Sequence, residues 1–183
     1  MNERKRLLIL GVVAIIAAIG FYAYSTRNNT QETVTNTHPD YKNITYVING
    51  KEVALNDGYA EAEAAPGSAS KIVTKYFGNE VHKDLNGDGK EDVAFLLTQE
   101  TGGSGTFYYV VAAIDTDNGY VGSHGYYIGD RIAPQTTESG SGDAIIVNYA
   151  DRLPDESFST KPSVGKSLYL QLNTSTMELQ EVQ

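Results

Sequence analysis

The chain has 183 residues, of which 40% are hydrophobic and 20% charged, enough for one domain with a buried core. It contains no Cys, which excludes disulfides, zinc–thiolate sites, iron–sulfur clusters and thiol nucleophiles. Its 23 acidic and 14 basic side chains give a net charge of −9, and residues 30–183, with 22 acidic and 10 basic side chains, carry −12. Such an acidic body repels phosphate backbones, so we expect no nucleic-acid partner.

The N-terminal region predicts one membrane-spanning helix. Residues 7–24 are an apolar run of 18 residues without charge or proline. As a helix this run is about 27 Å long, close to the roughly 30 Å hydrocarbon core of a bilayer. Basic residues within 1–6 predict a cytoplasmic N-terminus and an extracytoplasmic body, in a single-pass protein of the cell membrane. A cleaved signal peptide, ending near Ala18-Ile19-Gly20, is the alternative, and it leaves the body secreted.

Residues 25–40 are polar, rich in Thr and Asn, and show no hydrophobic period. Such a segment buries too little apolar surface to order itself, so we expect a flexible linker. An extracytoplasmic β-domain is then expected over residues 41–183.

The first part of this domain predicts a hairpin. Residues 44–48 and 52–55 are strand-like, and Asn49-Gly50 between them is a strong signal for a type I′ turn. Residues 59–64 alternate, but Ala and Glu are weak strand formers, so a strand, a helix and an irregular segment all remain open there.

The later segments predict more strands. Residues 71–77 and 92–99 lie on either side of a DLNGDG segment, and residues 106–115 are apolar on both faces, as expected of a central strand covered twice. Further strands are predicted at 120–129, 131–137, 143–150 and 166–172. Short strands separated by frequent turns indicate an all-β fold, an antiparallel sandwich or barrel.

One motif predicts a metal ion. Residues 84–92 read D-x-N-x-D-G-x-x-D, and alternate positions of such a tight loop supply the hard oxygens that Ca²⁺ prefers. The predicted ligands are the side chains of Asp84, Asn86, Asp88 and Asp92 and the main-chain carbonyl of Lys90. The role expected for calcium is structural, with a Kd on the order of 10⁻⁴–10⁻³ M. A metal-free turn between two strands is the alternative.

The twelfth position of the loop defines its type. An EF-hand needs a bidentate Glu there, whereas this chain has Phe95 within a strand-like segment. The loop therefore resembles the calcium loops of integrin-type β-propeller blades, which join two strands. A propeller needs several copies, and this sequence has one.

The wider sequence also resembles a bacterial envelope β-domain family of unassigned function. The resemblance rests on a D-L-N-G-D-G loop, a G-G-S-G-T-F segment before an aromatic strand, and a G-D-R step at 129–131. It covers roughly residues 41–181. It implies an envelope location and a β fold. In that family the domain sometimes accompanies a small barrel resembling membrane-bound lysozyme inhibitors.

Three functional hypotheses follow. The first is a non-enzymatic, calcium-stabilised binding module with an envelope protein or a glycan as partner. The second is a lysozyme-inhibitor-like protein that presents residues 102–109 or 120–131 to an enzyme. The third is a hydrolase using Glu100, Asp130 and His124, the least favoured because no nucleophile–base–orienter set is visible.

Two Asp-Arg pairs, Asp130-Arg131 and Asp151-Arg152, each end a predicted strand. A guanidinium paired with a carboxylate anchors a sheet edge, and we favour this role over ligand binding for both arginines.

Overall fold

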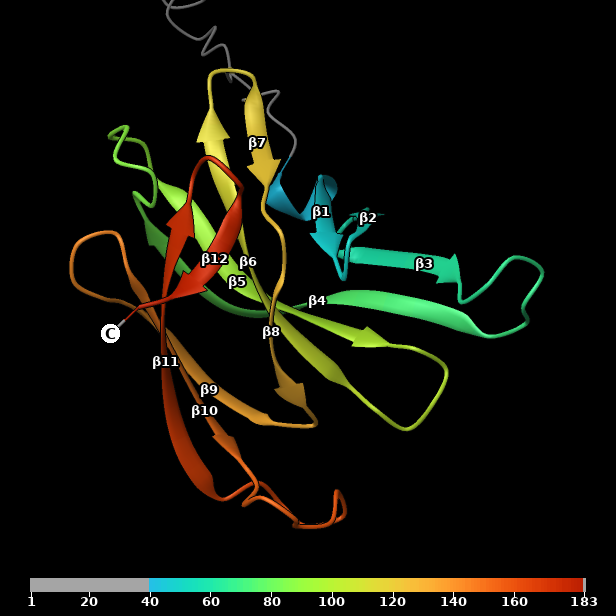
Figure 1. The fold of residues 1–183 in the computed structure, drawn as a ribbon. Coiled ribbons are helices and arrows are strands. Elements are labelled where there is room, and N and C mark those ends of the chain that lie inside the picture. Colours follow the sequence, from blue (N-terminus) through green and yellow to red (C-terminus); the bar gives the residue numbers. More distant parts are fainter. Residues whose placement is uncertain (1–39, 183) are drawn as a thin grey trace, which may run out of the picture. The chain divides into compact units, whose positions relative to one another are not determined.

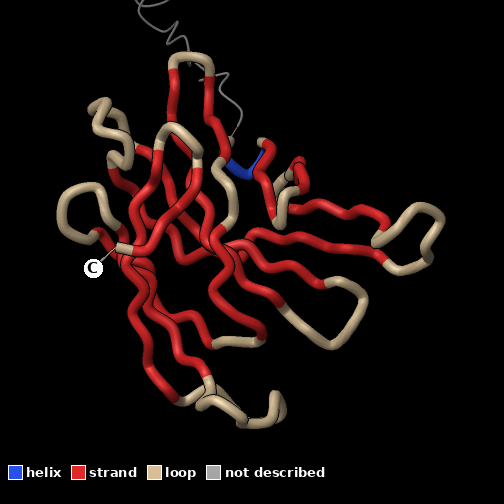
Figure 2. The backbone as a smooth tube through the Cα atoms, viewed as in Figure 1, coloured by secondary structure: helices blue, strands red, loops and turns tan. Residues whose placement is uncertain are grey.

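The computed structural model describes residues 40–182, and this part of the chain is built from antiparallel strands (Figures 1 and 2). Its one helical element is the 3₁₀ turn η1 (Tyr41–Asn43). The predicted span at 7–24 and nearly all of the predicted linker lie outside the described residues. Among the described residues, no helix is long and apolar enough to cross a membrane. The all-β, antiparallel prediction is confirmed.

The strands form three sheets. A two-stranded sheet contains β1 (Thr45–Ile48) and β2 (Lys51–Ala54). A six-stranded sheet has the order β3 (Tyr59–Glu63), β4 (Lys71–Lys83), β5 (Asp92–Glu100), β6 (Phe107–Thr116) and β7 (Gly119–Gly122), with β8 (Tyr126–Asp130) also paired to β6. A four-stranded sheet has the order β12 (Glu178–Glu181), β11 (Val164–Asn173), β10 (Ile145–Asp151) and β9 (Ala133–Ser139). These sheets do not close into a barrel.

The two central strands, β5 and β6, are covered on both faces, as the apolar run at 106–115 predicts. One face of β6, including Val110 and Ala112, packs against the four-stranded sheet in the larger core. The other face, including Tyr109 and Val111, packs under the β1–β2 hairpin in a second core. The hairpin and the four-stranded sheet thus lie on opposite sides of the six-stranded sheet (Figure 1).

The hairpin forms as its turn residues predict. Asn49 and Gly50 both have positive φ, 52° and 73°, which a type I′ turn requires. Its inward-facing Tyr46 and Ile48 are at most 1% exposed, and the Tyr46 ring meets Phe95 edge to face at 5.6 Å. The turn therefore sets the register that places both side chains in the second core.

Two strands differ from their predicted extent. The segment left open at 59–64 is strand β3, because it pairs with β4 despite the weak strand propensity of Ala and Glu. β4 continues from the predicted end at residue 77 to Lys83 through two register shifts at Gly78. Positive φ at Gly78 (110°) and Asn79 (53°) allows this bulge to bend the strand without ending it.

The strand predicted at 120–129 is interrupted. Ser123 is fully buried, and its hydroxyl accepts from the Ala112 amide at 2.8 Å and donates to the His124 carbonyl at 3.0 Å. A Cβ at Gly122 would lie 2.2 Å from the Thr45 carbonyl oxygen, so only glycine permits this approach to β1. β7 therefore ends at Gly122 and β8 begins at Tyr126.

Candidate functional site

The predicted calcium loop connects β4 to β5, and three of its predicted ligands fold back into it. Asp84 Oδ1 accepts from the amides of Asn86 and Gly87 at 3.3 and 2.7 Å, and its Oδ2 accepts from the Gly89 amide at 2.9 Å. The Asn86 and Asp88 side chains each accept from the amide two residues on, at 2.9 and 2.8 Å. The loop thus turns the oxygens of alternate residues inward.

These amides favour the charged form of Asp84. Hydrogen bonds from the main chain, that of Gly89 first, hold the pKa of the Asp84 carboxyl below its ordinary value. Gly87 and Gly89 have φ of 80° and 85°, a conformation that permits the tight path of the chain around this carboxylate.

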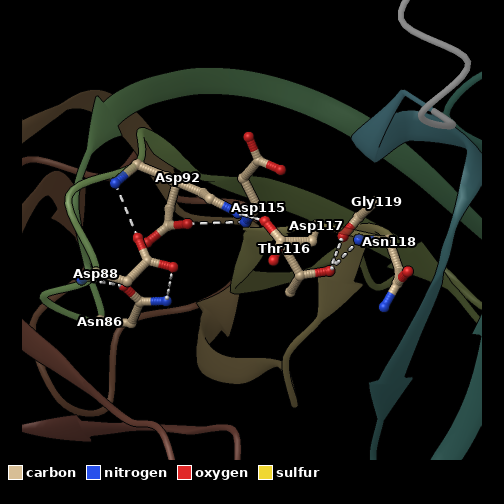
Figure 3. A network of polar contacts seen from close by, with 9 residues as sticks. Asn86, Asp88, Asp92, Asp115, Thr116, Asp117, Asn118 and Gly119 are labelled. Atoms are coloured by element: carbon tan, nitrogen blue, oxygen red, sulfur yellow. Dashed lines mark hydrogen bonds and ion pairs between the residues drawn. The ribbon is translucent and has the colours of Figure 1, made fainter.

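Asp92, the fourth predicted side-chain ligand, is the fully buried first residue of β5. Its Oδ2 accepts from the Leu85 amide at 2.8 Å. Its Oδ1 accepts from the Asp115 amide, also at 2.8 Å (Figure 3). Burial raises the pKa of Asp92, the two amides oppose that rise, and the charges of Asp88 and Asp84 add to it. Its carboxylate thus joins the loop to the end of β6 and interacts electrostatically with two other predicted ligands.

Lys90 secures the other side of the loop. Its amide donates to Asp88 Oδ1, and its Nζ lies 2.5 Å from Asp117 Oδ1 in the turn between β6 and β7. Figure 3 shows this turn beside the loop, with the Thr116 hydroxyl bonded to Gly119. The sequence pattern carries no signal for the Lys90–Asp117 ion pair or for the Asp92 contact with β6, because both join segments far apart in the chain.

The donor set fits calcium by its chemistry. Within residues 40–182, no group of three or more His, Cys, Asp or Glu side chains is arranged to hold a metal ion. The predicted set also includes the Asn86 amide and the Lys90 carbonyl, which are hard oxygen donors of the kind that Ca²⁺ takes. Asp84, Asn86 and Asp88 are brought together in the loop, whereas both oxygens of Asp92 also bind main-chain amides.

The residues of the hydrolase hypothesis have separate partners. Glu100 lies 3.5 Å from the Lys75 ammonium, and Asp130 accepts from the Thr106 amide at 2.9 Å and from the Arg131 guanidinium. His124 Nδ1 lies 3.9 Å from Glu178 Oε1, beyond hydrogen-bond distance.

The two predicted Asp-Arg pairs have different outcomes. Arg131 binds Asp130 through two hydrogen bonds of 3.1 and 2.8 Å, as expected. Asp151 pairs instead with Lys166 at 2.8 Å. Arg152 donates to the carbonyls of Thr160 and Arg131, because its neighbouring loop folds back over it.

A hollow of about 410 Å³ lies between β2 and the β3–β4 pair. Apolar side chains such as Val53, Ala62 and Ile72 line it, together with the buried, mutually hydrogen-bonded Thr74 and Gln99. None of the site residues predicted from the sequence lines this hollow.

Comparisons of the chain with protein-family models, with curated proteins and with solved structures find no match.

Proposed function

We propose that this protein is a membrane-tethered, extracytoplasmic β-domain that is stabilised by Ca²⁺ and acts as a non-enzymatic binding module. The apolar segment 7–24 and its basic N-terminal flank support the location. The separate partners of Glu100, Asp130 and His124 favour binding over catalysis by those residues. An envelope protein or a glycan is the proposed partner.

One observation carries the calcium proposal: the side-chain oxygens of Asp84, Asn86 and Asp88 all turn into one loop. Three carboxylates at this end of the sheet, with Asp92 buried among them, repel one another. A divalent cation bound by the loop offsets this repulsion. Because the loop joins β4 to the central strand β5, its closure stabilises the core of the domain.

Thermal unfolding of the full-length protein in calcium and in EDTA tests this proposal. Calcium at about one hundred times its Kd stabilises the native state by about 2.7 kcal/mol. For a protein of this size, this raises Tm by roughly 5–10 °C. Asp88→Ala removes a predicted ligand and is expected to abolish the calcium-dependent part of Tm.

Asp143→Asn is the matched control, because Asp143 is an exposed aspartate in the turn between β9 and β10. This variant should respond to calcium and EDTA as the wild-type protein does. Equal responses of Asp88→Ala and the wild-type protein would rule out calcium binding at the loop. So would a wild-type Tm that does not change on adding EDTA.

A further inference from the structure

The strand β3 is an open edge of the six-stranded sheet (Figure 1). It pairs with β4 along its whole length without a bulge. Exposed strand edges are usually blocked by Pro, Lys or a bulge, and the sequence of β3, YAEAE, contains neither residue. Beyond Tyr59, no other strand within residues 40–182 pairs with this edge. β3 therefore offers backbone groups with which another strand can pair.

The hydrogen bonds at both ends of β3 show which way its residues face. The Gly58 carbonyl accepts from the Tyr76 amide at 2.7 Å, and the Ala64 amide donates to the Ser70 carbonyl at 2.9 Å. Both bonds join even-numbered residues to β4 or to the turn before it. Since the backbone groups of successive residues in an antiparallel strand face opposite edges, the odd-numbered residues of β3 face outward.

The outward-facing backbone groups are those of Tyr59, Glu61 and Glu63. Tyr59 already has a partner, because its carbonyl accepts from the Asn56 amide at 2.9 Å and its amide donates to the Asn56 carbonyl at 3.0 Å. The open edge thus begins after Tyr59. It consists of the amides and carbonyls of Glu61 and Glu63, arranged as a pairing strand needs them.

The side chains of β3 give its two faces different characters. Ala60 and Ala62 face the β1–β2 hairpin and line the hollow of about 410 Å³, and Ala60 packs against the second core. Glu61 and Glu63 alternate with them, so their side chains point to the opposite face of the sheet. A strand added beside β3 would therefore place every second side chain at the hollow and the others beside the two carboxylates.

The hollow also contains buried polar groups. Gln99 is 6% exposed and Thr74 is 2% exposed, and Gln99 Nε2 donates to Thr74 Oγ1 at 3.2 Å. Within residues 40–182, this is the one hydrogen bond of the Gln99 side chain. Its carbonyl oxygen therefore retains the capacity to accept from a ligand. An apolar hollow of this volume with a few convergent polar groups is typical of a binding site.

Carboxylates predominate around the hollow. Glu52, Glu61 and Glu63 line it, whereas Lys51 is the one cationic residue among its lining residues. Lys71 Nζ lies 3.9 Å from Glu63, but both side chains are well exposed, so this pair is weak. In the part of the chain that the structure describes, Glu52 makes no ion pair. This excess of negative charge favours a partner that carries positive charge.

We propose that β3 binds an extended, basic peptide segment of a partner protein, which joins the six-stranded sheet as an additional edge strand. Apolar side chains of this segment fill the space that the alanines of β3 leave at the hollow. The basic side chains between them pair with Glu61 and Glu63, because opposite charges on neighbouring strands attract. This inference rests on the proposed function, since it names a protein segment as the partner of the binding module.

Calorimetric titration of the full-length protein, held in a zwitterionic detergent at about 0.15 M salt, tests the proposal. The probes are capped peptides of the sequence Thr-Lys-X-Lys-X-Lys-Thr, in which X is Val, Leu or Phe. At least one is expected to bind saturably. The scrambled peptide Lys-Lys-Lys-Thr-X-X-Thr has the same charge without the alternation. It should bind at least tenfold more weakly.

N-methylation of the bound peptide tests the backbone pairing. One form carries methyl groups on the lysine amides and the other on the amides of X, so each form lacks the donors of one edge. One of these edges must face β3 in either strand direction. At least one methylated form should therefore bind at least tenfold more weakly than the unmethylated peptide.

Glu61→Lys tests the charge pairing. This variant should bind the lysine peptide at least fivefold more weakly, and it should bind the peptide with Glu in place of Lys more tightly than the wild-type protein does. Glu138→Lys is the matched control. Glu61 accepts from the hydroxyl of Tyr59, two residues earlier, and Glu138 on β9 likewise accepts from Thr136, both at 2.7 Å. Glu138 does not line the hollow, so its variant should bind as the wild-type protein does.

Saturable binding to none of the peptides would overturn the proposal, and sedimentation of such a protein as a dimer would assign the edge to a second copy instead. Equal binding of the scrambled peptide, full affinity of both methylated forms, or wild-type affinity of Glu61→Lys would also overturn it. A protein that responds to calcium but binds no peptide would contradict this inference alone. Peptide binding without a calcium response would contradict only the calcium proposal.

Discussion

Among single residues, Asp92 connects the candidate metal loop to the end of β6. It is fully buried, yet its two carboxylate oxygens accept from amides in two different segments, at Leu85 and at Asp115. A buried charge of this kind is tolerated because both oxygens have donors. Asp92 therefore holds the loop to the end of β6 whether or not the other loop oxygens bind a cation.

Asp92→Asn tests this role. The amide nitrogen of Asn cannot accept a hydrogen bond, so either the Leu85 or the Asp115 amide loses its buried partner. We expect the free energy of unfolding in EDTA to fall by about 1–3 kcal/mol. Chemical denaturation of the variant and the wild-type protein measures the difference. A variant as stable as the wild-type protein would show that neither amide depends on the second carboxylate oxygen.

Among the elements, β4 carries a polar network that holds η1 against the sheet. Glu80 Oε1 accepts from the Tyr41 hydroxyl at 2.6 Å and from the Tyr76 hydroxyl, and Lys42 Nζ lies 3.7 Å away. Burial alone would raise the pKa of Glu80, but the two tyrosines and Lys42 lower it below its ordinary value. The pKa of the Tyr41 and Tyr76 hydroxyl groups shifts in the opposite direction, because burial and the neighbouring Glu80 carboxylate both raise it.

This network predicts a pH-dependent stability. The pKa of Glu80 is lower in the folded protein than its ordinary value of 4.5, so the native state favours the charged carboxylate. The contribution is therefore present above about pH 4.5 and is lost as the pH falls through the folded-state pKa. Glu80→Gln should be about 1 kcal/mol less stable than the wild-type protein at pH 7.

Denaturation curves of Glu80→Gln and the wild-type protein between pH 3 and pH 7 measure this effect. The stability gap should narrow as the pH falls below about 4.5 and toward the lower folded-state pKa of Glu80, because the unfolded state takes up the proton first. A gap of constant size over this range would mean that the charge of Glu80 contributes nothing to the stability of the domain.

Several elements were predictable because their signals are local. Asn49-Gly50 specifies its own turn type, and the apolar residues on both faces of 106–115 correctly predict a central strand that is covered on both sides. The side chains of Asp84, Asn86 and Asp88 accept from main-chain amides within the loop 84–92, whereas calcium binding there stays a prediction.

Other features depend on contacts between distant segments. β3 forms only because β4 pairs with it, and β4 passes Gly78 because its far half meets β5 and β9. His124 and Glu178 lie close together only after β12 has joined the four-stranded sheet. Neither composition nor spacing in one sequence carries this information, so the approach of His124 to Glu178 could not be predicted.

At the scale of the whole domain, two cores share one sheet. Adjacent residues of β5 point into opposite cores: Phe95 toward the hairpin and Leu96 toward the four-stranded sheet, both with no exposed surface. The Phe95 ring contacts the rings of Tyr41, Tyr46 and Tyr76 at centroid distances of 5.4–5.6 Å. Loosening either core therefore disturbs the same central strand.

This arrangement predicts that the domain unfolds as one unit. Phe95→Ala should destabilise it by about 3–5 kcal/mol and Leu96→Ala by about 2–5 kcal/mol. Because β5 belongs to both cores, each substitution should speed hydrogen exchange of the slowest amides on both sides of the sheet, in β1 as well as in β10. Exchange measured by mass spectrometry provides the comparison. If Phe95→Ala speeds exchange only in β1 and β2 and leaves β10 and β11 at wild-type rates, the hairpin layer unfolds independently of the domain.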